Sequence, residues 1–529
     1  MMNAATRLFA LAALLVCVAS PARAYDFTYT YANATLCYNI TDASAHTAEL
    51  TYQQRPNWEQ GIHAYAASLP DTLRIPATVL HNGENYRVTK IGEMALCNIS
   101  SVSVVIIPEG VVCLGDNGLS DCGALHAISL PQTLRTIGKY CFSSNNNLSA
   151  VVLPQNVATI GDGAFSGCHG LTTVVLPDSL EKISEQMFYC CPLTTAFSMP
   201  LGVKSIEGSA FAYTGLTSID IPQGVRKIYG SAFESTPLTS IELPSSVCWL
   251  GAAVFAKCNN LANINVAEDN AHYCSVDGVL FNKSRDTLWL YPCGRTSPHY
   301  DVPEGVVALH NYAFFACTRL ASVSLPASLR SIGCLTFSDC SFTQFDISAG
   351  VRFVASRAFM DCHQLSSISF GSGVQRIDAY ALAYCDHLTQ VTCKATTPPV
   401  LEDHIIYDVD NTIPVYVPCQ SIQQYEATQY WNDFVNFQCM EDAIEEPRVQ
   451  LLEIFPNPAR DVITVQRPKM EEDWQVQLCD MQGKVVKQDI MRCGQERLTL
   501  DIAPLPSGIY YIRAKGERDF AGLSIVVQR

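Results

Sequence analysis

The chemistry that this sequence could support centres on its cysteines. Of the 23 cysteines in the 529-residue chain, a periodic set follows an aromatic residue or its substitute by three positions. The set is Cys97, Cys122, Cys168, Cys191, Cys258, Cys317, Cys340, Cys362 and Cys385. Asn145, Thr214 and Thr236 take the same position in other units, and none of them can form a bridge. We therefore interpret the set as a ladder of small, buried, reduced thiols, with disulfides between neighbouring units as the alternative.

Other residues that could act as ligands or nucleophiles lack a supporting pattern. His169, His363 and His387 recur in the turn after the cysteine position, but they do not combine with cysteines at zinc-site spacing. Tyr407–Asn411 (YDVDN) places oxygen ligands at calcium-like spacing without the rest of an EF-hand loop. The G-x-S-x-G elbow of serine hydrolases does not occur. The sequence therefore predicts a protein that is not an enzyme, with no catalytic residues, no cofactor and no metal.

These residues are positioned by a repeat that runs through most of the chain. Leu216–Pro237 (LTSIDIPQGVRKIYGSAFESTP) and Leu238–Asn259 (LTSIELPSSVCWLGAAVFAKCN) are successive copies. Prolines keep the register at intervals of 22 or 23 residues: Pro108, Pro131, Pro154, Pro177, Pro200, Pro222 and Pro244. Such a period is typical of a solenoid, whose coils bury their apolar faces only by stacking. With ~4.8 Å between neighbouring strands, about a dozen coils would extend roughly 60 Å.

Within a unit, the hydrophobic pattern predicts a short strand and then a helical turn. Ile219 and Ile221 share one face of the strand, and Ser218 and Asp220 share the other. Ala232–Phe233 is expected to be the helical turn that places an aromatic ring in the core. The equivalent core positions are Phe142, Phe165, Phe188, Phe211, Phe255, Phe314, Phe337 and Phe359, with Leu382 in the last unit. The predicted fold class is an α/β solenoid of mostly short strands with short helical turns.

Segments without the repeat flank and interrupt it. Residues 1–24 are a predicted signal peptide, with an apolar run after Arg7 and cleavage after Ala24. His81-Asn82-Gly83 predicts a tight turn between two strands. The expected organisation is a β cap at 25–88, the solenoid at 89–395 with a projecting β-hairpin insertion at about 266–302, a second cap with a short helix at 396–440, a linker at 441–448 and a small all-β sandwich at 449–529.

Charge and hydropathy exclude two classes of partner. The chain has 34 basic and 50 acidic residues, a formal net charge of −16, and the sequence shows no lysine and arginine cluster of the kind that binds nucleic acid or anionic membranes. After the signal peptide, no apolar run reaches about 18 residues, the length of a membrane-spanning helix. The sequence therefore predicts an exported protein with no nucleic-acid partner and no membrane span.

The repeat region resembles a known family of surface proteins. Four features occur in order: YNI with VTKIG before the repeat, the repeat itself, SVDGVLFNK with LWLYP in the insertion, and TPP, YVP and W-x-x-F after it. Over Tyr25–Cys439 this arrangement is similar to the BspA-like leucine-rich-repeat proteins. The resemblance implies a leucine-rich-repeat solenoid with an adhesin-like role.

The C-terminal segment carries three further motifs, FPNPA, DMQGKVV and LPSGIYY. They resemble the type A sorting domain of the type IX (Por) secretion system of Bacteroidetes. The residues that carry the resemblance are Pro456, Asn457, Pro458, Asp480, Gly483, Gly508 and Tyr510. The resemblance implies a β-sandwich recognised by the type IX secretion machinery. The protein is then expected to cross the inner membrane and to reach the outer-membrane cell surface or the medium.

The outward positions of the predicted strands form the candidate binding face. They are Ser129, Val152, Val175, Ser198, Asp220, Glu242, Asn265, Ser324, Asp346 and Ser369. Val152 and Val175 are either a small apolar contact patch or simply good strand formers. A long regular surface suits a macromolecule better than a small substrate.

Three functions are compatible with such a surface. The first is an adhesin or protein-binding module for a host matrix or plasma protein, a host cell or another bacterium. The alternatives are a module that captures a glycan or nutrient, and a structural component of the surface layer. The expected partner is therefore an extracellular protein or glycan.

Overall fold

The computed structural model describes residues 24–57, 60, 64–65, 68–194, 197–403, 405–440, 453–466, 473–480, 484–515 and 520–528. The chain divides into two compact units. The first comprises Met1–Val417 with Ser421–Phe437, and the second comprises Pro418–Gln420 with Gln438–Arg529. The predicted signal peptide up to residue 23 and the predicted linker at 441–448 lie outside the described residues.

The first unit is a solenoid of about 15 coils with very little helix, and two ladders of parallel strands run along it. The strands of the Leu-x-x-Ile-x-Leu segments form the first ladder: β4 (Thr72–Arg74), β7 (Val104–Ile106), β9 (Ala127–Ser129), β11 (Ala150–Val152), β13 (Thr173–Val175), β17 (Ser240–Leu243), β19 (Asn263–Val266), β23 (His299–Asp301), β25 (Ser322–Ser324), β27 (Gln344–Ile347), β29 (Ser367–Phe370), β31 (Gln390–Cys393) and β33 (Val415–Pro418). This confirms the predicted leucine-rich-repeat solenoid.

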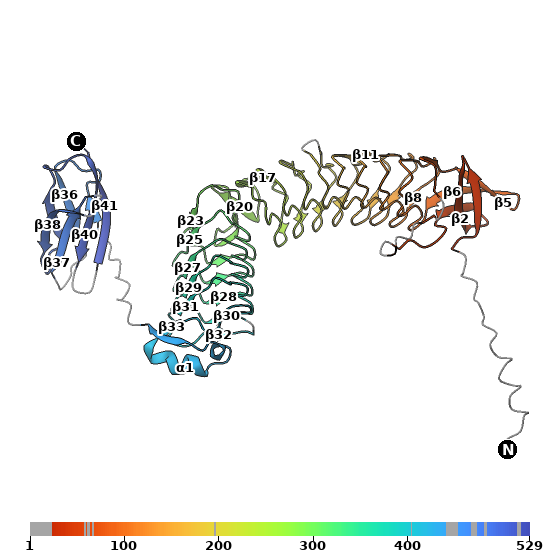
Figure 1. Cartoon of the computed structure of the whole chain (residues 1–529). Coiled ribbons are helices and arrows are strands. Elements are labelled where there is room, and N and C mark those ends of the chain that lie inside the picture. The colour runs from red at the N-terminus through yellow and green to blue at the C-terminus, as the bar shows by residue number, and fades with distance from the viewer. Residues whose placement is uncertain are drawn as a thin grey trace, which may run out of the picture. The chain divides into compact units, whose positions relative to one another are not determined.

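The Ile-Gly segments form the second ladder. Its strands are β8 (Cys113–Leu114), β10 (Thr136–Ile137), β12 (Thr159–Ile160), β14 (Lys182–Ile183), β15 (Ser205–Ile206), β16 (Lys227–Ile228), β18 (Trp249–Leu250), β24 (Ala308–Leu309), β26 (Ser331–Ile332), β28 (Phe353–Val354), β30 (Arg376–Ile377) and β32 (Val400–Leu401). In the later coils, β27, β29 and β31 line one side of the solenoid and β28, β30 and β32 the other (Figure 1). Each coil thus presents two different sheet surfaces.

The core between the ladders is a column of stacked aromatic rings. Phe165 and Phe188 stack with ring centroids 5.8 Å apart, and Phe188 and Phe211 follow at 5.6 Å. In the coil that closes the insertion, Tyr291 takes the aromatic position and stacks on Phe314 at 5.1 Å. Because each ring is covered by the ring of the next coil, burial depends on stacking, as the repeat predicts.

The segments expected to be helical turns are not helices. In each of these turns, two residues four apart have left-handed backbone, for example Tyr140 (φ 51°) and Ser144 (φ 61°). This alternation turns the backbone groups toward the next coil, so that the Phe142 N–H donates to Ala164 O at 2.8 Å. Hydrogen bonds between coils therefore accompany single i to i−3 bonds within each turn, such as Ser143 N–H to Tyr140 O at 3.1 Å, and no helix forms. Among the described residues, helix is confined to η2 (Cys419–Ser421), α1 (Ile422–Ala427) and η3 (Trp431–Asp433).

Strands cover the first coil, and the short helix covers the last. β1 (Phe27–Tyr31), β2 (Ala34–Asp42) and β3 (Thr47–Thr51) pair in order, and β3 pairs with β6 (Glu84–Ile91), which pairs with β8 of the second ladder. β5 (Thr78–His81) forms the expected hairpin with β6. At the other end, Tyr425 of α1 is buried, and its hydroxyl donates to Ala395 O at 2.7 Å. Both ends of the core are thereby sealed.

The insertion does not project from the solenoid as expected. β20 (Tyr273–Val276), β21 (Val279–Asn282) and β22 (Thr287–Leu290) pair antiparallel, and β22 then pairs parallel with β24. The hairpin is retained within the second ladder because Val279, Leu280 and Phe281 are all buried. The apolar core changes here from one cluster, which extends to Leu280, to another, which begins at Val279.

The second unit contains two antiparallel sheets around one core, as in a β-sandwich. The strands of these sheets are β35 (Glu453–Phe455), β36 (Val462–Gln466), β37 (Trp474–Cys479), β38 (Val485–Met491), β39 (Arg497–Asp501), β40 (Gly508–Lys515) and β41 (Phe520–Val527), and β34 (Phe437–Met440) belongs to neither sheet. One sheet has the order β35-β36-β39 and the other β38-β37-β40-β41. Trp474 and Ile512 lie in the shared core.

Candidate functional site

The candidate binding face lies on the outward side of the first ladder. The structure exposes all of its predicted members except Ser369, which is half-buried. Neighbouring members come from successive coils: Val152 pairs with Val175, and Glu242 pairs with Asn265. Val152 is 69% exposed and Val175 43% exposed, so the two valines form one contiguous apolar patch on this face. Whether the face binds a ligand remains a prediction.

The candidate binding face contains a hollow at a coil of the first ladder that forms no strand. The predicted strand at Ser218–Ile221 is not formed, although Ile219 and Ile221 are buried as expected. The Thr239 N–H still donates to Thr217 O at 3.1 Å, but the first ladder resumes only with β17. In the preceding unit, Leu193 and Pro200 are seven positions apart where Leu171 and Pro177 are six apart. An extra residue on one side of a ladder disrupts the pairing next to it.

The hollow that results has a volume of about 390 Å³. Its polar lining comes from Ser218, Asp220, Ser240, Glu242 and Asn265, together with Gln223. Three of the predicted face residues, Asp220, Glu242 and Asn265, therefore surround one depression. Two exposed carboxylates beside hydroxyl and amide groups favour a cationic or hydrogen-bonding ligand group.

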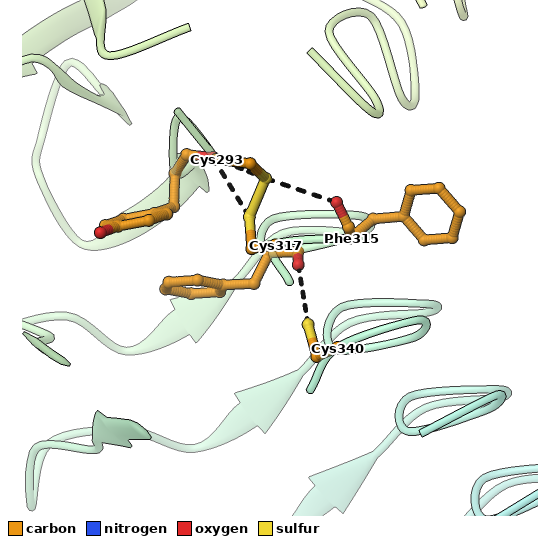
Figure 2. Close-up of a disulfide and its surroundings, with 6 residues drawn as sticks. Cys293, Phe315, Cys317 and Cys340 are labelled. Atoms are coloured by element: carbon orange, nitrogen blue, oxygen red, sulfur yellow. Dashed lines mark hydrogen bonds between the residues drawn. A yellow bond between two sulfur atoms is a disulfide. The ribbon is translucent and has the colours of Figure 1, made fainter. Parts of the chain in front are cut away.

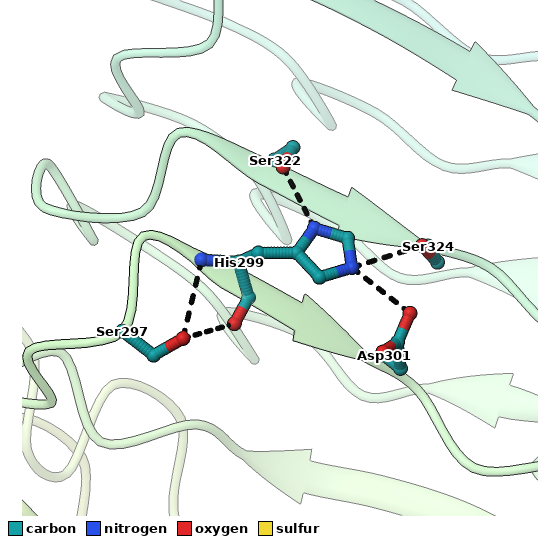
Figure 3. A network of polar contacts seen from close by, with 5 residues as sticks. All are labelled: Ser297, His299, Asp301, Ser322 and Ser324. Carbon is teal, nitrogen blue, oxygen red and sulfur yellow. Dashed lines mark hydrogen bonds and ion pairs between the residues drawn. The ribbon is translucent and has the colours of Figure 1, made fainter. Parts of the chain in front are cut away.

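A polar network on the same face includes two residues that the sequence analysis missed. The His299 ring is held between Asp301 (Nε2 to Oδ1, 2.9 Å) and Ser322 (Nδ1 to Oγ, 2.7 Å), with Ser324 Oγ 3.2 Å from Nε2 (Figure 3). The contact with His299, followed by that with Ser324, lowers the pKa of the Asp301 carboxyl. Asp301 pairs with Ser324 in register. The signal for it was present, because Pro303 precedes Pro326 by one repeat of 23 residues.

The order aspartate, histidine, serine invites comparison with a serine nucleophile. Such a nucleophile needs backbone donors aimed at the developing oxyanion. Here the N–H groups of Ala321 and Ser322 both donate to Pro298 O, at 2.7 and 3.1 Å. Since the ladder already uses these two donors, they are not directed at an oxyanion beside Ser322, and the network orients side chains on the face.

The periodic cysteine position is a hydrogen-bond donor site beside a buried turn carbonyl. Cys191 Sγ donates to Phe165 O at 2.9 Å, and Cys340 Sγ donates to Phe314 O at 3.1 Å. Thr214 Oγ1 donates to Phe211 O at 2.8 Å, and Asn145 Nδ2 donates to Phe142 O at 2.9 Å. The position therefore takes any small side chain that can donate. Burial raises the pKa of Cys122 and of Cys340 to about 12, which keeps these thiols protonated.

One member of the set departs from the reduced interpretation. Cys317 forms a disulfide with Cys293, and the two Cα atoms are 4.6 Å apart (Figure 2). The other eight members are free thiols. Cys293 lies on the neighbouring coil, at the end of the insertion, so this bridge is the expected alternative realised at one place. A second disulfide joins Cys419 and Cys439 within the second unit.

The histidines and the acidic turn have local partners. His363 Nδ1 lies 3.0 Å from Asp386 Oδ1 on the next coil, and both side chains are exposed. Asp410 Oδ1 accepts hydrogen bonds from the backbone N–H and the hydroxyl of Thr412. In the part of the chain that the structure describes, no three His, Cys, Asp or Glu side chains are placed to hold a metal ion.

Several sorting-motif residues close turns of the second unit. Asn457 Oδ1 accepts from Val526 N at 2.9 Å, and Asp480 Oδ1 accepts from Lys484 N at 3.0 Å. The Tyr510 hydroxyl donates to Pro506 O at 3.0 Å. Gly483 lies outside the described residues. The motif positions described here thus hold the local fold, and contact with secretion machinery remains a prediction for them.

None of the described helices combines the length and the hydropathy that crossing a bilayer requires.

Comparison with known families identifies two regions of the chain. A family model for the BspA type leucine rich repeat region matches six copies, over residues 84–194, 181–277 and 293–407. A model for the secretion system C-terminal sorting domain matches residues 453–528. No curated protein matches the chain.

Solved bacterial structures are also similar to the chain. The pneumococcal vaccine antigen PcpA is 18% identical with a TM-score of 0.43, covering 76% of this chain and 95% of its own. A leucine-rich repeat protein from Bacteroides ovatus is 22% identical with a TM-score of 0.42, covering 79% and 100%. A leucine rich cell surface protein from Faecalibacterium prausnitzii is 25% identical with a TM-score of 0.43, covering 70% and 95%. The family assignment rests on the family models.

Proposed function

Because the chain belongs to the BspA-type leucine-rich-repeat family and ends in a secretion sorting domain, we propose that it is an adhesin-type surface protein that binds an extracellular protein. The sorting domain supports secretion by the type IX machinery to the cell surface. In this proposal a signal peptide cleaved after Ala24 directs the first export step. Binding and not catalysis is the activity, since a leucine-rich-repeat solenoid is a scaffold that offers surface.

The hollow on the first ladder is the observation that carries the proposal. Asp220 and Glu242 are both exposed and come from successive coils, with Asn265 on the next. A lysine or arginine of an extracellular protein could enter this depression and meet both carboxylates. Charged groups in such a pocket determine partner choice and association rate more than total affinity. We propose host matrix or plasma proteins, host cells and other bacteria as the sources of such partners.

The test is saturable binding of the secreted, processed protein to immobilised matrix and plasma proteins. The double variant Asp220→Asn/Glu242→Gln removes two charges without changing side-chain size. The control Asp408→Asn/Glu426→Gln removes the same charge from exposed positions in the second cap. We expect roughly tenfold weaker binding for the first pair, about 1.4 kcal/mol, and no change for the control.

The outcomes separate the alternative functions. Saturable binding to a protein that the first pair weakens supports the adhesin. If the two double variants bind equally well, the contact lies outside the hollow. Saturable binding to glycans alone would assign the protein to nutrient capture, and no saturable binding to either class would leave a structural role in the surface layer.

A further inference from the structure

The surface charges of the solenoid are divided between its two ladders. From β9 to β31, the outward positions of the first ladder hold four carboxylates, those of Asp220, Glu242, Asp301 and Asp346, and no lysine or arginine among the described residues. The outward positions of the second ladder, from β10 to β30, hold eight cations and only two described carboxylates, those of Glu181 and Asp286. The cations are Arg135, Lys182, Lys204, Arg226, Lys227, Arg330, Arg352 and Arg376. A chain with a net charge of −16 therefore keeps one basic face.

The cations are densest on β14, β15, β16 and the segments that precede them. Lys182 and Lys227 lie in one column of the ladder, with Ser205 between them and Trp249 after them. Lys204 and Arg226 lie in the adjacent column, where the Arg226 N–H donates to Lys204 O at 2.8 Å. We call Lys182, Lys204, Arg226, Lys227 and Trp249 the basic patch.

Most of the patch is not neutralised. Lys204 contacts Glu181, which is itself 70% exposed. No described carboxylate lies in ion-pair range of Lys182, Arg226 or Lys227, whereas Arg376 on the same ladder contacts both Asp378 and Glu402. The nearby Glu207 accepts a hydrogen bond from Ser205 at 2.7 Å. Unpaired exposed cations attract a polyanion, and the attraction falls as salt rises.

An aromatic pair borders the cations. Trp249 is 42% exposed, and its ring lies against that of Tyr229 with centroids 4.8 Å apart. The contact fixes the indole orientation and leaves part of its apolar surface open. Such a ring can cover the C–H face of a sugar while the neighbouring cations bind its acidic groups.

From this arrangement we infer that the basic patch binds an acidic polysaccharide, a linear polymer whose sugars carry carboxylates or sulfates. The cations recur across successive strands about 4.8 Å apart, which suits a chain with regularly spaced charges lying along the solenoid. Duplex DNA is a poorer match, because it carries one charge per about 1.7 Å of its axis, more densely than the cations recur. Its remaining phosphates would lie over a net acidic protein. The inference concerns another ladder than the proposed protein contact, so each can fail without the other.

The experiment measures binding of the secreted, processed protein to polygalacturonate, with neutral dextran and duplex DNA as comparison polymers. The variant Arg226→Gln/Lys227→Gln removes two cations of the patch. The control Arg74→Gln/Arg87→Gln removes the same charge from exposed positions near the first cap. Trp249→Ala tests the aromatic contribution, and circular dichroism checks that each variant is folded.

We expect saturable binding to polygalacturonate that weakens about tenfold or more in Arg226→Gln/Lys227→Gln. The slope of log affinity against log salt should fall by about 0.7 for each cation removed. Trp249→Ala should weaken binding with the slope unchanged, and the control should bind as the unmodified protein does. Absence of saturable binding to polygalacturonate, equal loss in the control, or tighter binding to DNA than to the polysaccharide would each overturn the inference.

Discussion

The donor requirement at the periodic cysteine position can be tested by exchanging a single atom group. Thr214 is 4% exposed, and its Oγ1 donates to Phe211 O at 2.8 Å. Thr214→Val keeps the shape of the side chain and replaces the hydroxyl with a methyl group. In an apolar site this change would be stabilising, because burying a hydroxyl without a partner costs about 1–3 kcal/mol. Here the hydroxyl has a partner, so we expect the opposite sign.

The expected cost is about 1 kcal/mol, the net value of one neutral hydrogen bond. It stays near that value because Phe211 O also accepts from the Thr214 N–H at 3.3 Å and is not left unsatisfied. A change of about 1 kcal/mol corresponds to roughly fivefold more frequent local opening. Thr214→Cys should stay close to the unmodified protein, because a thiol in this position donates to the Phe carbonyl of the preceding coil, as Cys191 does.

Hydrogen exchange followed by mass spectrometry is the suitable assay, because a solenoid opens locally and one residue barely shifts its global melting. Amides of the coil that contains Phe211 should exchange about fivefold faster in Thr214→Val. Thr217→Val, at an exposed position of the next unit, should leave the rate unchanged. If Thr214→Val exchanges as slowly as the unmodified protein or more slowly, the position is apolar and the donor argument is wrong.

Three further predictions concern stability and thiol chemistry. The pKa values of Cys122 and Cys340 are raised to about 12, so above pH 9 the unfolded chain releases thiol protons that the folded chain retains. The free energy of unfolding from urea titrations should therefore be flat from pH 7 to 8 and should fall above pH 9 by about 1.4 kcal/mol per pH unit for each of these thiols. Phe188→Ala opens a gap in the aromatic column and should cost about 3–5 kcal/mol, seen as loss of exchange protection in the adjoining coils. Iodoacetamide at pH 8 should modify the exposed Cys248 and Cys493 in the native protein, and mass spectrometry should find the buried thiols modified only after unfolding.

The parts of the fold that follow a strict pattern could be predicted from sequence. Ile241 and Leu243 point inward and Glu242 outward because alternation along β17 determines facing. The turns could not be assigned in the same way, since left-handed backbone at residues such as Tyr140 is imposed by hydrogen bonding between coils. A four-residue spacing of apolar side chains fits both a helical turn and the turn with left-handed residues.

The residues of the candidate site could be predicted from the sequence, but the hollow that they surround could not. Asp220, Glu242 and Asn265 follow from the register, whereas the hollow between them lies where the coil that carries Asp220 forms no strand of the first ladder. His299 and Asp301 were missed because the insertion hides the unit they belong to. The basic patch was missed because the sequence shows no cluster of cations: Lys182, Lys204 and Arg226 lie 22 residues apart and are adjacent only in the folded coil.

The Cys293–Cys317 bridge has a consequence for a protein pulled by its ends, as a surface protein is when fluid drags on what it holds. A stacked solenoid yields by peeling, and a coil of 23 residues that comes free lengthens the chain by about 80 Å at ~3.4 Å per residue. The bridge closes a loop of 24 residues in sequence, so the coil beside the insertion can leave the stack without adding that length. Tension therefore passes through two sulfur atoms there, and only coils outside the bridged loop can lengthen the chain by unstacking.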